Sequence, residues 1–248
     1  MIENTLLKTM TVSVVMPVYN EKTYIWTVIK MVVDTGIPDE LVVVDDFSTD
    51  GTRELLAAIS RGEYPDADYM KDKRCAIKVF FHDKNRGKGA GLRTGFEKAG
   101  SDIVIVQDAD LEYDPRDYSK LLAPILEGKA DVVYGSRFMG DSHRVLFFWH
   151  MIGNKTLTLF SNILTNLNLT DMETGYKAFR SHVLKGLTLT SDRFGFEPEI
   201  TARIAKKRYR IYETSISYAG RTYEEGKKIN WKDGVAAFWH ILRFNLFN

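Results

Sequence analysis

The 248-residue chain carries 34 Lys and Arg against 33 Asp and Glu, so its formal net charge is +1 and it lacks the overall basic field of a nucleic-acid-binding protein. Its hydrophobic content of 44% is enough for a sizeable core, and its length fits one α/β domain. The single cysteine, Cys75, excludes an internal disulfide and a zinc site built from cysteines.

The first half of the chain alternates apolar runs with helical patterns. Continuous Val- and Ile-rich runs predict buried strands at 11–17, 41–44, 77–81, 103–106 and 132–134. Helices are predicted at 21–34, at 52–59 with Asp50 as the cap, from 85 towards 100, and after Pro115, whereas 61–74 is expected to be an exposed loop. Such an alternation predicts a mainly parallel sheet with helices on both faces.

The pattern changes after Gly135. A short strand is predicted at 176–179, and the segment 145–169 predicts two amphipathic helices. The C-terminal segment 235–247 is similarly apolar. Core packing and a surface for a lipid acceptor or a bilayer interface explain both apolar segments equally well, so both interpretations stay open.

No segment meets the requirements for crossing or being exported through a membrane. The first ten residues lack the apolar run of a signal peptide. Segment 145–169 is interrupted by polar residues such as His150, Lys155 and Asn162, whereas a spanning helix needs about 20 mainly apolar residues. We therefore expect a cytoplasmic protein, with any contact to the inner face of the membrane being peripheral.

Three acidic residues follow the apolar run 103–106, within the segment Gln107-Asp108-Ala109-Asp110-Leu111-Glu112. Ligands of open parallel sheets bind beyond the carboxyl ends of the strands. Carboxylates in that position can bind a hard divalent cation, which would neutralise charge developing on a diphosphate leaving group. Because Asp-x-Asp is common by chance, it is the position after a buried strand that favours a metal site over a loop of solvated acids.

Polar groups also follow the neighbouring predicted strands. Tyr19 and Glu21 follow the first strand, and Asp45 and Asp46 end the second. A uracil or guanine ring could stack on the tyrosine and hydrogen-bond to an aspartate. The basic, glycine-rich segment 85–89 could approach a phosphate or a ribose, but it satisfies neither the Walker A pattern nor G-x-G-x-x-G. A P-loop nucleotidase and a dinucleotide oxidoreductase therefore lose their main support.

Together these segments resemble glycosyltransferase family 2, and most closely its dolichyl-phosphate mannose or glucose synthase branch. The likeness runs from about Thr11 to Asp233 and is carried, in chain order, by 14–21, 43–52, 85–89, 107–112, 135–138, 171–179, 196–199 and 221–228. The resemblance implies a single GT-A domain with a Rossmann-like sheet. Its 11–135 half would bind the nucleotide sugar, and its 136–248 half would face the acceptor.

The resemblance also implies roles for individual residues. The nucleoside pocket would be lined by Pro17, Tyr19, Glu21 and Asp46, with Lys88 also on the donor side. The metal, Mg²⁺ or Mn²⁺, would be held with the diphosphate by Asp108, Asp110 and Glu112, although branch members often have Gln at the last position. Donor or acceptor phosphates would be contacted by Arg137, Arg221 and Lys228.

Family members are similar in using inverting displacement, and the acceptor decides which groups are needed. A polyprenyl phosphate is already an anion and needs only cations to position it, for which Arg137, Arg221, Lys227 and Lys228 are suited. A glycan or small-molecule hydroxyl needs a general base, and the candidates are Asp171, Glu173 and Glu197. Our main hypothesis is transfer of a hexose from a GDP-mannose or UDP-glucose type of donor to a polyprenyl phosphate. A hydroxyl acceptor, a non-catalytic nucleotide-sugar-binding module and a nucleotidyltransferase are the alternatives.

Overall fold

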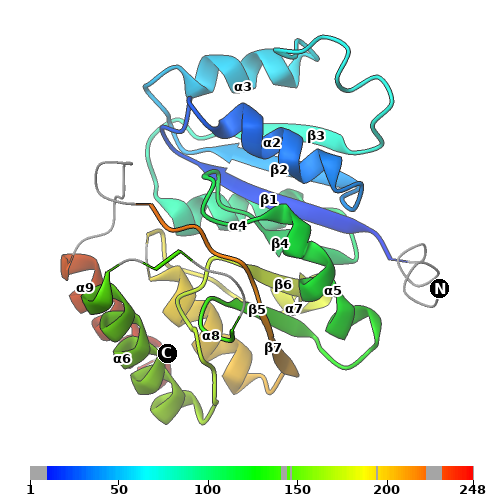
Figure 1. Ribbon diagram of the computed structural model, residues 1–248. Coiled ribbons are helices and arrows are strands. Elements are labelled where there is room, and N and C mark those ends of the chain that lie inside the picture. Colours follow the sequence, from blue (N-terminus) through cyan, green and yellow to red (C-terminus); the bar gives the residue numbers. More distant parts are fainter. Residues whose placement is uncertain (1–9, 141–143, 146, 194, 222–230, 248) are drawn as a thin grey trace.

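A computed structural model describes residues 10–140, 144–145, 147–193, 195–221 and 231–247 of the chain. Its centre is a seven-stranded sheet in the order β3-β2-β1-β4-β6-β5-β7. Helices cover the sheet on both faces, and two further helices, α6 and α9, lie side by side at one end of the molecule (Figure 1). The predicted GT-A type of fold is therefore confirmed at the level of architecture.

The predicted strands form where continuous apolar runs were found. The described strands are β1 (Val12–Val18), β2 (Glu40–Asp45), β3 (Ala76–Phe81), β4 (Ile103–Val106), β5 (Val132–Ser136), β6 (Lys177–Arg180) and β7 (Ile211–Ser215). All neighbouring pairs are parallel except the two made by β6, which is antiparallel to both β4 and β5. The sequence gives little signal for strand β7, because its five residues, Ile-Tyr-Glu-Thr-Ser, are mostly polar and do not form an apolar run.

The helices of the described residues connect these strands and extend the second half. They are α2 (Ile25–Asp34), α3 (Thr52–Ser60), α4 (Lys88–Lys98), the 3₁₀ helix η1 (Pro115–Asp117), α5 (Tyr118–Leu126), α6 (Phe148–Thr165), α7 (Ser181–Lys185), α8 (Phe196–Lys206) and α9 (Trp231–Leu246). Segment 61–74 contains turns, as expected of a loop. Its Tyr64 and Tyr69 are not simply solvated, because their rings pack against Trp26 of α2.

Two apolar cores lie on opposite faces of the sheet because strand side chains alternate in direction. On β1, Val14 and Met16 join the core covered by α2, α3 and α5, whereas Val15 joins the core covered by α4 and α8. The central strands are therefore buried on both sides, as continuous apolar runs predict. This rigid double layer fixes the strand ends from which the polar side chains project.

The prediction of two amphipathic helices in 145–169 is wrong. The described residues form one helix there, α6, which ends where Asn166 adopts a left-handed conformation with φ of 56°. The polar residues that suggested a break do not interrupt the helix. The Asn162 amide instead bonds the backbone of Leu169 after the helix, donating to its carbonyl at 2.7 Å and accepting from its N–H at 3.1 Å.

Asp50 secures the start of α3 without being its N-cap residue. Gly51 occupies that position with φ of 96°, and Asp50 accepts hydrogen bonds from the Thr52 N–H and hydroxyl at 3.0 and 2.6 Å. In the part of the chain that the structure describes, no helix is both long and apolar enough to cross a membrane.

Candidate active site

Polar side chains that follow or precede six strands meet at one edge of the sheet. Strands β1, β2, β4, β5 and β7 run in the same direction and end there, and the antiparallel β6 begins there. The sequence continues from these ends into residues 19–21, 46, 108–112, 137 and 218–221, and the turn 171–176 leads into β6. This edge is where an open α/β sheet binds its ligands.

The three predicted metal ligands lie on the turn after β4, and two cations hold them. Arg221 spans Asp110 and Glu112, with its Nη2 2.6 Å from Asp110 Oδ2 and its Nε 3.3 Å from Glu112 Oε1. Asp108 faces Lys88 instead, with Nζ 2.7 Å from Oδ1. Among the residues that the structure describes, no three potential ligands surround one point ready to hold a metal ion.

The electrostatics of this turn favour binding of a cation. Burial, together with the carboxylates of Asp108 and Glu112, raises the pKa of Asp110 to about 7, and Arg221 opposes that rise. Burial by itself would lower the pKa of Lys88, but Asp108 and Glu197 raise it well above its usual value. The oxygen donors fit Mg²⁺ or Mn²⁺, which take carboxylates alongside phosphate and water oxygens.

Buried groups beneath the acidic turn fix its shape. Gln107 is fully buried, and its Oε1 accepts hydrogen bonds from the hydroxyls of Tyr118 and Tyr176 at 2.7 and 2.6 Å. Gly175 passes so close to Asp108 that a Cβ there would lie 2.5 Å from Oδ2. The sequence showed these residues as parts of motifs, but their supporting role needs the tertiary contacts.

The predicted nucleoside side is built around Asp46, which is only 3% exposed. Its carboxylate accepts the backbone N–H groups of Arg86 and Gly87 at 2.8 and 2.6 Å and contacts His82 Nδ1 at 2.7 Å. It therefore positions the glycine-rich loop before α4. The carboxylate of Asp45 is engaged in an ion pair, because Arg53 Nη1 lies 2.8 Å from its Oδ2.

The remaining predicted nucleoside residues come from β1 and the turn after it. Pro17 is part of β1, where α4 packs against it closely enough that a Cβ on Gly91 would lie 3.2 Å from its Cβ. Tyr19 is 41% exposed at the end of the strand. Glu21 lies 3.6 Å from Arg221 Nη1, so the same arginine joins the first strand to the acidic turn.

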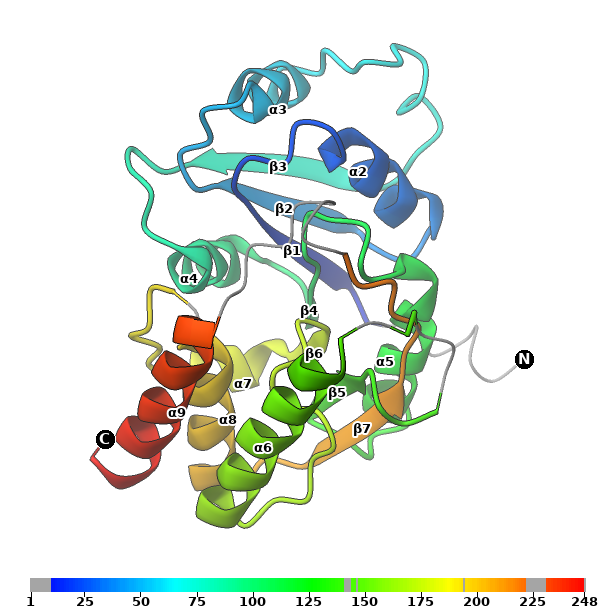
Figure 2. The ribbon, with the colours of Figure 1, turned by 60° about the vertical axis from the view of Figure 1, so that its left-hand side comes forward.

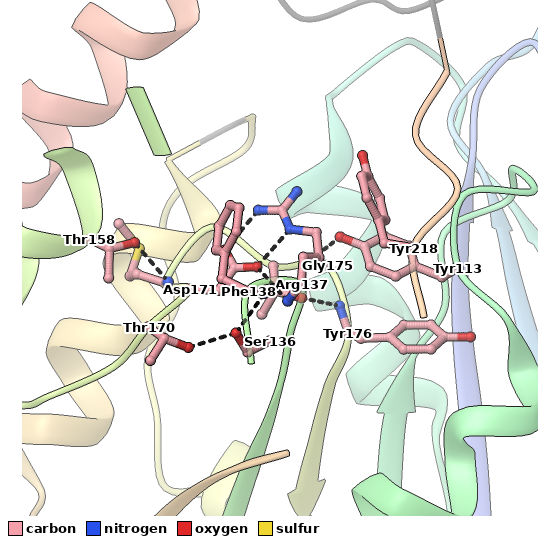
Figure 3. Close-up of polar contacts among 12 residues, drawn as sticks. Tyr113, Ser136, Arg137, Phe138, Thr158, Thr170, Asp171, Gly175, Tyr176 and Tyr218 are labelled. Carbon is pink, nitrogen blue, oxygen red and sulfur yellow. Dashed lines mark hydrogen bonds and ion pairs between the residues drawn. The ribbon is translucent and has the colours of Figure 1, made fainter. Parts of the chain in front are cut away.

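Arg137 is held at the end of β5 by a bidentate pair with Asp171 (Figure 3). Nε and Nη2 donate to the carboxylate at 2.6 and 2.7 Å, and the guanidinium also lies 5.2 Å from the ring centroid of Tyr218. Burial opposes the charge of Arg137, but Asp171 raises the pKa of the guanidinium well above its usual value. Arg137 is therefore a fixed cation whose Nη1 is not used by this pair.

Two more carboxylates and a lysine complete this side of the edge. Glu197 lies 3.5 Å from Lys88 Nζ. Glu173 has a buried Oε1 that finds no hydrogen-bond partner in the described part of the chain, and burial with Glu197 nearby raises its pKa to about 8. Lys177 is buried and donates to the carbonyls of Met172 and Thr174, which holds the turn before β6.

Two residues that were not singled out from the sequence belong to the site. Tyr218 donates its hydroxyl to Glu112 Oε2 at 2.9 Å. Tyr113 accepts the N–H of Gly175 at 2.9 Å (Figure 3). Their positions, next to the acidic segment and three residues before Arg221, were the available signal. The predicted phosphate ligands Lys227 and Lys228 lie outside the described residues.

Comparison with known proteins shows to which family the chain is related. The family model described as "Glycosyl transferase family 2" matches residues 13–188. An undecaprenyl-phosphate mannosyltransferase of Micrococcus luteus is 29% identical, covering 96% of this chain and 99% of that protein. The dolichol-phosphate mannosyltransferase of Pyrococcus furiosus is 28% identical over 88% of this chain, which spans 59% of that protein.

Another relative with a similar sequence identity is named for a different sugar. The UDP-N-acetylglucosamine–dolichyl-phosphate N-acetylglucosaminyltransferase of Methanococcus voltae is 27% identical over 94% of this chain and 95% of its own length. Among solved structures, glucosyl-3-phosphoglycerate synthase from Mycobacterium tuberculosis, in complex with Mn²⁺ and UDP, superposes with a TM-score of 0.72 at 20% identity. That likeness covers 98% of this chain and 82% of the synthase, and it shows a shared fold.

Proposed function

The chain belongs to glycosyl transferase family 2 and is a glycosyltransferase, and we propose that it moves a hexose from a nucleotide diphosphate sugar to a polyprenyl phosphate with inversion at the anomeric carbon. In that reaction an acceptor phosphate oxygen bonds to the anomeric carbon. The bond from that carbon to the donor phosphate breaks, and its electron pair leaves on the nucleoside diphosphate. A divalent cation, when bound, neutralises the charge that develops on the leaving diphosphate.

The donor would lie along the edge made by β1, β2 and β4. We assign the nucleoside to Pro17, Tyr19 and Glu21, beside the loop that Asp46 positions. The metal and the diphosphate would lie at Asp108, Asp110 and Glu112. Lys88 and Arg221 already pair with these carboxylates. When a metal ion binds the carboxylates instead, both side chains would be close enough to contact the donor phosphates.

One observation carries the choice of a phosphate acceptor: the carboxylates that could act as a base for a hydroxyl are committed or protonated. Asp171 is fully buried and held in a bidentate pair by Arg137. Glu197 lies beside the Lys88 ammonium. Burial and the nearby Glu197 raise the pKa of Glu173 to about 8, so at neutral pH most of this carboxyl carries a proton and only a small fraction is free to accept one from a hydroxyl. An anionic acceptor needs no base, only fixed cations such as Arg137.

A polyprenyl acceptor also needs an apolar surface, and the outer helices supply one. Helices α6 and α9 pack together through Phe160 and Phe238, whose ring centroids are 4.1 Å apart. Exposed aromatic side chains lie on both helices, with Phe148 at 59% and Trp149 at 78% on α6, Trp239 at 56% on α9, and Phe247 at 71% directly after α9. Tryptophans next to exposed aliphatic residues suit a bilayer interface, so we assign this pair of helices to peripheral membrane contact.

The test is a transfer assay with a panel of labelled UDP- and GDP-sugars, a short-chain polyprenyl phosphate and either Mg²⁺ or Mn²⁺. The variants are Asp110→Ala and, as a matched surface control, Asp72→Ala in the exposed loop. We expect label to enter the organic phase with the wild type and the control, and not with Asp110→Ala. The donor that reacts would also identify the sugar and the nucleotide.

Two other outcomes would contradict parts of the proposal. Metal-dependent hydrolysis of the donor without any lipid product would be consistent with a glycosyltransferase but would contradict the lipid acceptor. Hydroxyl compounds would then be tested as acceptors. Equal lipid labelling by the wild type and Asp110→Ala would show that the Asp110 carboxylate is not needed for transfer.

A further inference from the structure

A polar pocket of about 670 Å³ lies between the loop before α4 and helix α9. Residues 187–193, which follow α7, run between α4 and α9 (Figure 2). The wall of the pocket is formed by 84–86, 190–193, Gly195, His240 and Arg243. It shares no residue with the acidic turn 108–112, although Asn85 and Arg86 in its wall belong to the glycine-rich loop that borders the donor edge.

The pocket carries an excess of positive charge that carboxylates of the described residues do not neutralise. Four cations, Lys84, Arg86, Arg193 and Arg243, are exposed in its wall. In the described parts of the chain, none of the four pairs with a carboxylate. The carboxylate in the wall, Asp192, is instead paired with Arg93 of α4. Unpaired basic side chains gathered around one hollow favour binding of an anion.

Two buried polar atoms in the same wall have no hydrogen-bond partner among the described residues. They are Ser191 Oγ and His240 Nδ1, and the whole Ser191 residue is only 8% exposed. Both lie next to Gly195, where an added Cβ would be 2.8 Å from each atom. Buried polar groups are almost always paired with protein, water or a ligand, so two neighbouring unpaired ones mark a place where a bound polar group would be stabilised.

The charge state of His240 fits a hydrogen-bonding role. Burial, and then the nearby cation of Arg243, lower the pKa of His240. A neutral imidazole has one N–H donor, and the Ser191 hydroxyl provides another. Guanidinium groups add paired donors that match phosphate geometry.

We propose that this pocket binds a phosphate group, as a site separate from that of the donor. The cations supply the attraction, and Ser191 and His240 supply the buried hydrogen bonds. The inference does not depend on the proposed transfer reaction, because it concerns binding in the absence of a nucleotide sugar.

The site is connected to the donor loop through the backbone. The carbonyl of Asp192 accepts the N–H of Ala90 at 3.1 Å, and the carbonyl of Ser191 accepts from Arg93 at 2.7 Å. Gly87 and Gly89 leave no room for a Cβ against this segment. A bound phosphate would therefore hold in place the same segment that packs on the loop positioned by Asp46.

The experiment measures binding of inorganic phosphate to the full chain without donor, from the NMR shifts of the backbone amides. We expect phosphate to shift the amides of Asn85, Arg86, Ser191 and Asp192. Ser191→Ala and Arg193→Gln should each weaken binding about tenfold, which is the effect of losing one charge-assisted or buried hydrogen bond. The matched control is Lys207→Gln, an exposed cation at the end of α8 that should leave binding unchanged.

Ser191→Ala separates a binding role from a structural one. Its hydroxyl has no partner in the described protein, so its loss should not lower the unfolding midpoint in the absence of phosphate. Unchanged phosphate binding in both variants would overturn the proposal. So would shifts confined to the amides around Arg221.

Vesicle sedimentation distinguishes the two sources of the phosphate. Phosphatidylcholine vesicles with and without phosphatidic acid would be compared for the wild type and Arg193→Gln. Retention that needs phosphatidic acid and falls in the variant assigns the group to a lipid headgroup, next to the exposed Trp239 and Phe247 of the C-terminal segment. Binding of soluble phosphate without such retention assigns a soluble phosphoester.

Discussion

Two acidic pairs end strands on either side of β1, and the protein treats them differently. After β2, Asp46 is satisfied by two backbone N–H groups and by His82, and Asp45 is paired with Arg53 of the following helix. After β4, Asp108 and Asp110 are instead held by Lys88 and Arg221, whose long side chains reach them from α4 and from beyond β7. Similar sequence motifs therefore have different partners.

The kind of partner decides what each pair can do. Backbone N–H groups are fixed parts of the fold, so the carboxylate that accepts them is a structural element. Lysine and arginine side chains have several rotatable bonds and can move aside, so the carboxylates that they neutralise stay available to another cation. The comparison predicts that Asp46 of the β2 pair controls stability and that the β4 pair controls chemistry.

The largest expected effect is on turnover in Asp110→Asn. Asparagine keeps the shape of the side chain but removes the charge that would hold the metal and diphosphate. We expect the rate of transfer to fall by about 10³-fold or more, on the scale of losing a central electrostatic group, while the unfolding free energy changes by about 1 kcal/mol or less. Steady-state transfer and urea unfolding would be measured on the same preparation. A large loss of stability in this variant would break the comparison.

The next effect is on stability in Asp46→Asn. The new amide group turns donors towards the N–H groups of Arg86 and Gly87, which leaves at least one buried donor unpaired. We expect a loss of about 2–3 kcal/mol in the unfolding free energy. Asp83→Asn, an exposed aspartate just before the same loop, is the matched control and should be near neutral. Full stability in Asp46→Asn would mean that the glycine-rich loop does not depend on this carboxylate.

The sequence predicted the strands and the groups that follow them, because both are local features. Continuous apolar runs mark strands buried on two faces, and polar motifs placed directly after such runs must lie at the same edge of a parallel sheet. That reasoning placed Tyr19, Asp46, Asp110 and Arg137 at the strand ends, where the structure also has them.

Pairing between distant side chains could not be predicted in the same way. Arg221 reaches Asp110 across a sequence separation of 111 residues, and the pair between Asp171 and Arg137 joins segments 34 residues apart. The helix α6 was divided wrongly because polar side chains such as Asn162 can cap a following loop without ending a helix. Such contacts depend on how distant segments pack together, and a local residue pattern does not show which distant side chain will be its partner.

The smallest expected effect is the pH dependence of metal binding at the β4 pair. The pKa of Asp110 is raised to about 7 from an ordinary value of 3.8, so below neutral pH the carboxyl holds a proton that a metal must displace. Affinity for Mn²⁺ should therefore fall by up to about tenfold for each pH unit below the pKa, and level off above about pH 8. Free Mn²⁺ would be measured by electron paramagnetic resonance in the absence of donor.

Arg221→Ala sharpens this last prediction, because the arginine both competes with the metal and lowers the pKa of Asp110. Without it, the midpoint of the pH dependence should move upwards, while affinity on the high-pH plateau should rise several-fold because no resident cation needs to be displaced. Arg116→Ala, an exposed arginine paired with Asp114, is the control. A plateau affinity that falls in Arg221→Ala would show that the arginine supports the metal site instead of occupying it, and Arg221 would then belong with the fixed partners of the β2 pair.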